Sequence, residues 1–390
     1  MVDPRLSEDV FIEILIRLPV KSIVKLRCVS KTWRDLIRSP IFIQRYQNRE
    51  RKQSVLLVKR YTTRQYEDEA ILSFHNPDFP ELLVSPYLSI PVLKDIDFPK
   101  IIYSDVQRYS DVQIYGPCNG LVCIPVDNII FLCNPALREF KPLPPPNIPC
   151  PNGYQIWAFE FGFGFDPNTS SYKVMQISQI GADNYEDFHL KLDHYERFDL
   201  YNSTSNSWKH IDEKLPMITC LPSFQTLFGG AFHWYAWKDI NDYPYILCFD
   251  IRTEAFQLLD FPDDFPEAEY LSSLTVLNEN LALIGIQRWR GEPEPSQIIE
   301  IWVMKQYGVK ESWTKQFVIG PYMDCCPFLL LNDEWLLVES DNGRLGLCAL
   351  HENKFKGLPF YGFRLSFRAM VYEESLISLN DIISSDCENE

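Results

Sequence analysis

The chain has 390 residues, of which 46% are apolar, 23% charged and 14% aromatic, a balance typical of globular proteins that excludes a disordered or fibrous chain. The length favours a small domain plus a large one, and the excess of Pro (28) over Gly (16) favours short strands with rigid turns. The formal net charge is −16, and no run of about 18 apolar residues predicts a membrane span.

The charge is unevenly distributed along the chain. Residues 1–60 contain 14 Lys or Arg and 6 Asp or Glu, a net charge of +8. The remaining residues contain 23 basic and 47 acidic side chains, a net charge of −24. Two parts of opposite sign indicate two different partners, and the acidic part is expected to repel nucleic acid.

Four short helices are predicted in the first 50 residues. The first covers residues 8–18, with Ser7 as its N-cap and Pro19 as its stop. The second lies within residues 22–29, and Ser30 is expected to cap a third helix. Ser39 and Pro40 then open a fourth helix over residues 41–46.

These helices are too apolar for their size. The apolar positions of residues 8–18 run almost all the way round the helix, which predicts burial on more than one side. Some 45 residues in short helices cannot bury this much apolar surface alone. The segment is therefore either a helical cap on the large domain or a docking face for another protein.

One motif runs from Leu6 through the Leu18-Pro19 pair to Trp33. It resembles the plant F-box and departs from the common pattern at Ser7, where many F-boxes have Pro. The resemblance implies that residues 1–50 bind an acidic SKP-type adaptor and, through it, cullin and RING subunits. It also implies which residues form or support the adaptor face: Leu6, Val10, Ile14, Leu15, Leu18, Pro19, Val29 and Trp33.

From about residue 54 the sequence changes to short apolar and aromatic runs broken by Asn, Asp, Pro and Gly. One unit recurs at residues 130–140, 164–174, 197–209 and 248–256, and more weakly near 301–313 and 346–355. Each unit predicts a β-hairpin in which Asp or Asn caps the turn and an aromatic residue packs on the first strand. Asp166, Asp199 and Asp250 are accordingly interpreted as structural turn residues rather than catalytic carboxylates.

The repeated hairpins predict the fold class. Their spacing is uneven but is compatible with a β-propeller or a related closed array. The predicted fold is thus α+β and multi-domain: a helical F-box module at residues 1–50, followed at residues 51–390 by an all-β, β-propeller-like domain built as a kelch-like hairpin array. Such arrays present rims of loops to a partner.

The sequence contains no motif of an enzyme or a metal site. The six His are scattered; His189 and His194 are five apart, and Cys118, Cys123, Cys325 and Cys326 lack zinc-site partners at the usual spacing. Several of the eleven Cys lie in apolar runs, which predicts reduced, buried thiols in a cytoplasmic or also nuclear protein. We expect a non-catalytic protein without cofactor or metal, although a glycan-binding or enzymatic propeller remains an alternative.

The large domain also resembles a family. Residues 116–123, 133–140, 163–174 and 301–313 are similar, in this order, to the plant F-box-associated domain of type 1. Within that group the sequence pattern is most similar to that of the S-locus F-box proteins of gametophytic self-incompatibility. This resemblance implies a substrate receptor of an SCF ubiquitin ligase in pollen, whose client is the basic pistil S-RNase. Related proteins share these segments and recognise other clients, such as immune receptors or regulators.

Clusters of acidic residues recur along the sequence of the large domain. They are either ordinary solvated loops or acidic rims that attract a basic client. The residues predicted to bind the client are Asp183, Glu186, Asp187, Asp239, Asp242, Asp263, Asp264, Glu267 and Glu269.

Overall fold

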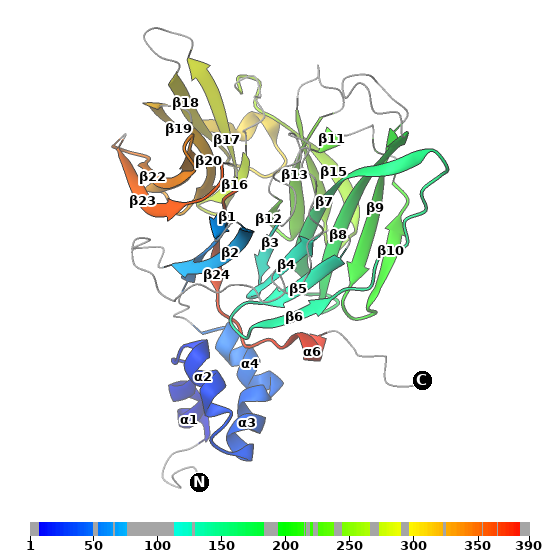
Figure 1. Ribbon diagram of the computed structural model, residues 1–390, viewed down its shortest axis with the longest axis vertical. Coiled ribbons are helices and arrows are strands. Elements are labelled where there is room, and N and C mark those ends of the chain that lie inside the picture. The colour runs from blue at the N-terminus through cyan, green and yellow to red at the C-terminus, as the bar shows by residue number, and fades with distance from the viewer. Residues whose placement is uncertain are drawn as a thin grey trace.

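The structure is a computed structural model. It describes residues 8–49, 54–64, 67–75, 113–126, 129–182, 194–213, 215, 219–220, 225–237, 244–265, 273–289, 296–322, 325–352, 354–364 and 366–382. A helical module lies at one end of a ring of β-sheets (Figure 1). Throughout these ranges, every helix is too short or too polar to cross a membrane.

Four helices form the module, as predicted: α1 (Glu8–Leu15), α2 (Val20–Leu26), α3 (Lys31–Arg38) and α4 (Pro40–Gln47). The prediction that the first helix reaches Leu18 is wrong, because the chain tightens after Leu15 into a turn in which the Leu18 N–H donates to the Leu15 carbonyl at 2.9 Å. Pro19 takes an extended conformation and becomes the N-cap of α2, so α2 begins two residues earlier than predicted. Ser7 lies outside the described residues.

Two serines define the later helices, and both predictions are confirmed. The Ser30 hydroxyl accepts the N–H of Trp33 at 3.2 Å and caps α3. The Ser39 hydroxyl accepts the N–H of Phe42 at 3.2 Å and donates to the Leu36 carbonyl at 2.8 Å, so it closes α3 and opens α4. Pro40 occupies the first turn of α4, where its missing N–H costs no helical bond.

The β domain consists, over the described residues, of six sheets whose paired strands are antiparallel. The first is β2 (Glu67–His75), β1 (Ser54–Arg64) and β24 (Arg368–Glu373); the second is β3 (Tyr115–Cys118), β4 (Leu121–Val126), β5 (Ile129–Asn134) and β6 (Glu139–Pro142). The third is β7 (Tyr154–Asp166), β8 (Ser171–Ala182), β9 (His194–Asn202) and β10 (Ser207–Ile211).

The other three sheets follow in chain order. The fourth contains β11 (Thr219–Cys220), β12 (Thr226–Phe228), β13 (Ala231–Trp237), β14 (Tyr245–Asp250) and β15 (Ala255–Asp260). The fifth contains β16 (Ser273–Leu277), β17 (Asn280–Trp289), β18 (Ser296–Met304) and β19 (Trp313–Tyr322), with the 3₁₀ turn η1 (Lys310–Ser312) before β19. The sixth contains β20 (Cys325–Leu330), β21 (Trp335–Ser340), β22 (Arg344–Ala349) and β23 (Phe355–Tyr361), and the short helix α6 (Leu379–Ile382) ends the described chain.

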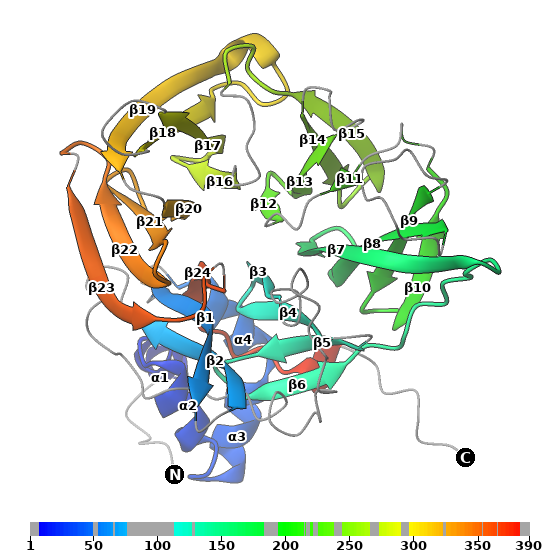
Figure 2. The ribbon, with the colours of Figure 1, turned by 45° about the horizontal axis from the view of Figure 1, so that its top comes forward.

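The sheets close into a ring, which confirms the β-propeller-like prediction (Figure 2). The innermost strands β24, β3, β7, β12, β16 and β20 contact one another in that order, and β20 contacts β24 again. The closing sheet joins the two ends of the β domain, because β1 pairs with β24 from Ser54 opposite Glu373 to Lys59 opposite Arg368. This pairing closes the ring.

Apolar contacts between neighbouring sheets hold the ring together. Strand β4 is buried at every position from Leu121 to Val126, because both faces of its sheet are covered by neighbours. The outer strand β10 is mostly exposed. Side chains also bridge adjacent sheets: the Thr226 hydroxyl donates to the Leu274 carbonyl at 2.9 Å, and the Gln297 side chain accepts the Cys325 N–H at 3.0 Å.

The predicted hairpin turns are confirmed at three acidic or amide residues. Asn134 accepts the N–H of Ala136 at 3.0 Å, Asp166 accepts that of Asn168 at 2.9 Å, and Asp250 accepts that of Arg252 at 2.9 Å. Each side chain thereby satisfies a backbone donor that the turn leaves free.

The predicted turn position of Asp199 is wrong. Asp199 lies inside β9, is 3% exposed, and accepts two bonds from the Arg197 guanidinium, at 2.8 Å to Nε and 2.9 Å to Nη2. The strand continues three residues further, and Asn202 caps the turn by accepting the N–H of Thr204 at 2.8 Å. The conclusion that Asp199 is structural still holds, because its carboxylate is engaged by Arg197.

Candidate adaptor-binding surface and client-binding face

The helical module has a buried core and an exposed apolar surface. Its core comprises Ile12, Leu15, Ile16, Val20, Ile23, Ile37, Phe42 and Tyr46. Outside this core, Val10 is 45% exposed, Ile14 49% and Val29 62%. Val10 and Ile14 are four residues apart on α1 and therefore share a face of that helix. Large aliphatic side chains left in water beside a filled core indicate a docking surface.

The other predicted adaptor residues divide into exposed and supporting positions. Pro19 is exposed, Leu18 is half-buried and Leu15 is only 3% exposed. Trp33 is half-buried and packs edge-to-face against Phe11, with ring centroids 4.8 Å apart. Leu6 lies outside the described residues.

Sequence reasoning missed one exposed apolar residue, Ile41, which is 68% exposed at the start of α4. Its neighbour Phe42 is fully buried, so the two side chains leave the helix in different directions. Ile41 lies in a run of apolar residues, and the periodicity of so short a run does not show which of them faces the core. Helices α4 and α1 are tied by an ion pair between Arg45 and Asp9 at 3.1 Å.

The surface around these apolar side chains is basic. Residues 9–49 contain nine Lys or Arg, and only Asp9, Glu13 and Asp35 are acidic. Seven of the basic residues are exposed: Arg17, Lys21, Lys25, Lys31, Arg34, Arg38 and Arg45. A basic surface with exposed aliphatic groups complements a partner that is acidic at its rim and apolar at its centre.

Only two of the predicted client-binding residues lie within the described chain. Asp263 and Asp264 follow β15, and both are exposed. Asp263 forms an ion pair with Lys310 of η1, so part of its charge is already compensated. The remaining predicted positions lie outside the described residues: Asp183, Glu186, Asp187, Asp239, Asp242, Glu267 and Glu269.

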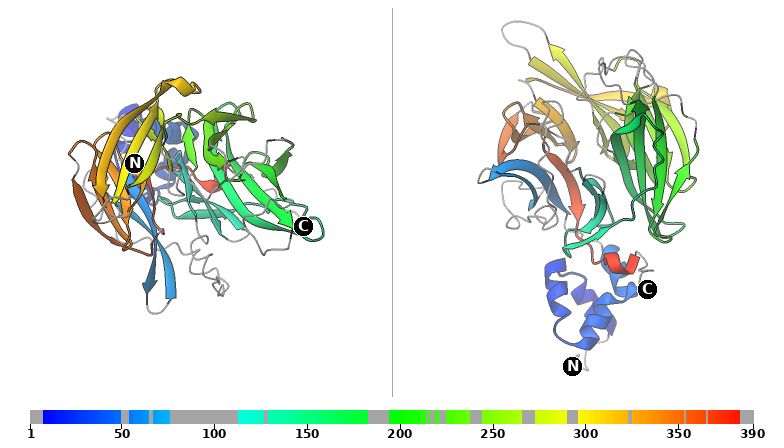
Figure 3. Two further views of the ribbon diagram at one scale, coloured as in Figure 1. Left: turned by 90° about the horizontal axis from the view of Figure 1, so that it is seen from above. Right: turned by 45° about the vertical axis from the view of Figure 1, so that its right-hand side comes forward.

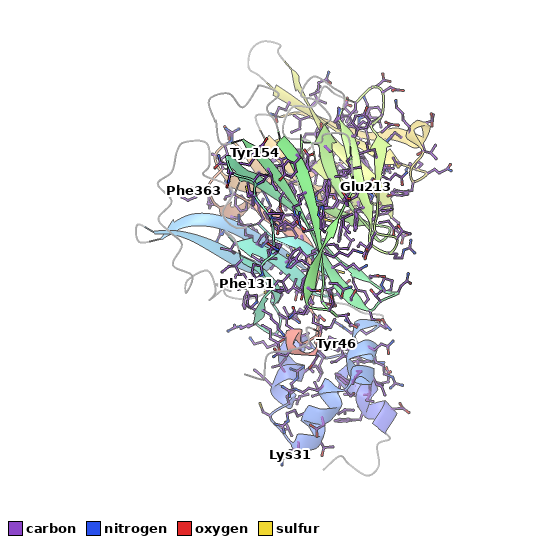
Figure 4. All side chains as sticks on the ribbon, turned by 90° about the vertical axis from the view of Figure 1, so that its right-hand side faces the viewer. Lys31, Tyr46, Phe131, Tyr154, Glu213 and Phe363 are labelled. Atoms are coloured by element: carbon purple, nitrogen blue, oxygen red, sulfur yellow. The ribbon has the colours of Figure 1, made fainter. Side chains whose placement is uncertain are left out.

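The strand ends that precede these acidic segments can be placed. Ala182 pairs with Tyr154, and Figure 4 shows Tyr154 at the end of the β domain away from Lys31 and Tyr46 of the helical module. In the next sheet, Ala236 pairs with Tyr245, which pairs with Asp260.

These two sheets share their orientation. A Cβ at Gly162 would lie 2.7 Å from the Trp234 ring, and one at Gly164 would lie 2.8 Å from the Phe232 ring, so β7 and β13 run in opposite directions. The ends at Ala182, Ala236 and Asp260 therefore all lie at the end of the ring remote from the module.

The described residues contain no cluster of three His, Cys, Asp or Glu suited to a metal ion. His233 is fully buried, and burial lowers its pKa to about 4. Its Nδ1 lies 3.2 Å from the Thr226 carbonyl, which can only accept, so Nδ1 donates and Nε2 accepts from the Tyr307 hydroxyl at 2.8 Å. Cys248 lies 3.1 Å from the same hydroxyl, and burial raises the pKa of its thiol. The group is a chain of neutral hydrogen bonds and provides no thiolate nucleophile.

The cysteines predicted to be buried are buried. Cys123 and Cys133 are fully buried, and Cys248 is 3% exposed. Cys118 is half-buried, and burial raises its pKa to about 12. These thiols fill apolar space between strands and are not activated for chemistry.

Several curated plant proteins are similar in sequence to this chain. The chain is 24% identical over 396 residues to F-box protein CPR1 of Arabidopsis thaliana, covering 95% of this chain and 88% of that protein. It is 25% identical over 411 residues to F-box protein At3g07870 (95% and 91% covered), and 26% identical over 319 residues to F-box protein At5g65850 (80% and 70%), both from the same plant. The solved structure of YCF48 from Cyanidioschyzon merolae shares 8% identity, with a TM-score of 0.30 over 68% of this chain and 92% of that chain.

Two family models match the chain. The F-box domain matches residues 4–45, which contain the helices α1 to α3 and most of α4. The F-box associated beta propeller domain matches residues 90–375, which is most of the ring. The chain therefore belongs to the family of proteins with an F-box associated beta propeller domain, and it carries an F-box at its N-terminal end.

Proposed function

We propose that this protein is a substrate-receptor subunit of an SCF (cullin–RING) ubiquitin ligase. The F-box module binds a SKP-type adaptor through Val10, Ile14, Pro19 and Val29, and Leu15, Leu18 and Trp33 support that surface from below. The observation that carries the proposal is the set of exposed aliphatic side chains on a basic module that the F-box model matches. The receptor does no bond chemistry itself; it raises the concentration of client lysines near the charged ubiquitin carrier.

The client is a basic protein bound by the β domain. Three strand ends that precede acidic segments in the sequence lie at the end of the ring remote from the module. The adaptor and the client are thus bound at opposite ends of the molecule. Acidic rims steer a basic protein toward this end and favour it over acidic competitors.

The narrower form of this proposal is that the client is a non-self S-RNase in pollen. Its support is the similarity of residues 116–123, 133–140, 163–174 and 301–313 to S-locus F-box proteins, together with the net charge of −24 after residue 60. Secreted ribonucleases of this type are basic, so charge and resemblance favour the same client. A different client, such as an immune receptor or regulator, leaves the ligase role unchanged.

The adaptor surface is tested with the double variant Val10→Glu, Ile14→Glu. Two carboxylates in an apolar contact must be desolvated without partners, so binding of a purified SKP-type adaptor to the full chain should weaken by at least about a hundredfold. Calorimetry measures the affinity. The matched control is Val318→Glu on β19, where Val318 is 60% exposed on the propeller. Equal adaptor affinity for the double variant and the control would show that this surface is not the docking site.

A further inference from the structure

The end of the chain connects the helical module with the propeller. Residues 374–382, here named the C-terminal strap, follow β24 and end in α6. Figure 3 shows this red segment between the blue helices and the sheets. It contacts both the helical module and the propeller.

On the module side, the strap supplies a core residue and a carboxylate at the start of a helix. Leu376 is fully buried within the same cluster as Ile12, Ile23 and Phe42. Pro19, the N-cap of α2, makes no side-chain cap bond, and the half-buried Glu374 carboxylate faces the Val20 N–H at this end of the helix. A side chain from the C-terminal strap therefore lies beside the free N–H groups at the start of α2.

On the propeller side, two side chains fix the strap. The Asn134 amide donates to the carbonyls of Ser375 at 3.2 Å and Ile377 at 2.7 Å. The Glu139 carboxylate accepts the Ser378 hydroxyl at 3.0 Å and the Leu379 N–H at 2.8 Å. Leu379 is 1% exposed and packs in the apolar cluster between the second and third sheets.

Gly120 permits this close approach. It has a φ of +74°, and a Cβ at this position would lie 2.2 Å from the Ser375 Cβ and 2.7 Å from the Glu373 carbonyl oxygen. The Tyr372 hydroxyl donates to the Gly120 carbonyl at 3.0 Å. The turn between β3 and β4 is thus shaped to seat the strap, and only glycine fits there.

We propose that the C-terminal strap completes the adaptor-binding module, so that the F-box helices reach their docking structure only when Leu376 and Glu374 are in place. The motif at residues 4–45 is then not sufficient for adaptor binding, because its core lacks one apolar side chain and α2 lacks its cap. The same segment sets the direction in which the propeller faces the ligase, since Asn134 and Glu139 hold it to the ring. The identity of the partner rests on the proposed function; the effect of the strap on the helices does not.

The experiment compares hydrogen exchange and adaptor binding in the full-length protein and four variants. Leu376→Ala leaves a cavity in the module core, and amides of α2 and α4 should exchange about tenfold faster or more. Binding to a purified SKP-type adaptor should weaken by a similar factor. Ile382→Ala, which removes an apolar contact on the propeller side of the strap, is the matched control and should leave both quantities unchanged.

Glu374→Ala removes only the cap, and it keeps the test informative if Leu376→Ala unfolds the whole chain. It should speed exchange in the first turn of α2, and Glu374→Gln, which retains an acceptor oxygen, should restore most of the protection. Unchanged exchange of α2 and α4 in both Leu376→Ala and Glu374→Ala would overturn the proposal. If the wild type binds no adaptor at all, the proposed function fails, while hydrogen exchange still decides the role of the strap.

Discussion

At the scale of single residues, the buried charges of the propeller are structural. Lys173 has a side chain only 3% exposed, and its ammonium group contacts Asp166 Oδ2 at 3.0 Å, Glu254 Oε1 at 3.0 Å and the Ile251 carbonyl at 2.9 Å. Burial raises the pKa of Asp166, but hydrogen bonds from Thr169 and Lys173 outweigh it and hold the pKa below its usual range. The cluster joins the third and fourth sheets, so these carboxylates are not free for catalysis.

Replacing Lys173 by Met should therefore destabilise the protein strongly. The buried Asp166 carboxylate loses its cation, whereas Glu254 keeps Lys209, and the free energy of unfolding should fall by about 3–5 kcal/mol. Urea unfolding measures it. Lys209 is the matched control: it also pairs with Glu254, but its side chain is 59% exposed, so Lys209→Met should cost about 1 kcal/mol or less. Similar losses for both variants would contradict a dominant role for the buried cluster.

Because the pKa of Asp166 is lowered in the folded state, its stabilising effect is complete above the unfolded value of about 3.9 and is lost as the pH falls through the lower folded value.

Glu160 on β7 has the opposite pH dependence. It is 4% exposed, and its Oε2 has no hydrogen-bond partner among the described residues. Burial raises its pKa well above the usual range, and Arg368 only partly offsets this.

The free energy of unfolding of Glu160→Gln should consequently rise, relative to that of the wild type, as the pH rises. The folded wild type retains a proton that the unfolded chain releases above about pH 4.3, so the wild type loses up to about 1.4 kcal/mol per pH unit until the folded pKa is reached. Unfolding free energies of both proteins from pH 4 to pH 8 measure the difference. A difference that stays constant over this range would show that Glu160 is ionised in the folded protein.

At the scale of secondary-structure elements, the serine caps account for the helix boundaries of the module. Ser39 stabilises two helices at once, because its hydroxyl accepts from Phe42 N–H and donates to the Leu36 carbonyl. Among the described residues, the Ser30 hydroxyl makes one hydrogen bond, which it accepts from the Trp33 N–H to cap α3.

Ser39→Ala should then cost more than Ser30→Ala, about 1–2 kcal/mol against about 1 kcal/mol. Hydrogen exchange of the backbone amides of α3 and α4 compares the two variants. The reverse order would mean that the bond between Ser39 and Leu36 contributes nothing to stability.

Local patterns predicted these elements, and nonlocal contacts limited the prediction. Ser30 and Ser39 each satisfy a donor three residues away, and the turn residues Asn134, Asp166 and Asp250 act within three residues, so short sequence windows suffice. The pairing of β1 with β24 and the seating of the strap join opposite ends of the chain, and no local pattern encodes them.

The candidate adaptor surface was partly predictable, because some of its residues belong to a local motif and others depend on how the helices pack. The resemblance to the F-box predicted Val10, Ile14 and Val29, which are exposed. The exposure of Ile41 depends on the direction of α4, which only the structure gives. On the β domain, charge composition predicted acidic rims, yet the ion pair between Asp263 and Lys310 depends on two sheets meeting. Site residues that depend on neighbouring blades require the structure.

At the scale of the whole molecule, the two ends of the protein differ in structure and in charge. A basic helical module that exposes aliphatic side chains lies at one end, and strand ends that precede acidic segments lie at the other (Figures 1 and 4). The strap joins the two parts through shared cores. Such a molecule can hold two partners of opposite charge at a fixed separation, which is what a ligase receptor requires.

The most direct measurement is affinity purification of the tagged full-length chain from pollen extract to which pistil extract has been added. The proteasome is inhibited, and the purification is done at low and at moderate salt. The wild type should retain a SKP-type adaptor, cullin and a basic protein that carries ubiquitin, and the basic protein should be lost as salt rises. The variant Val10→Glu, Ile14→Glu should retain the basic protein without ubiquitin and lose adaptor and cullin. Absence of adaptor and cullin from the wild type, or their retention by the variant, would contradict the account.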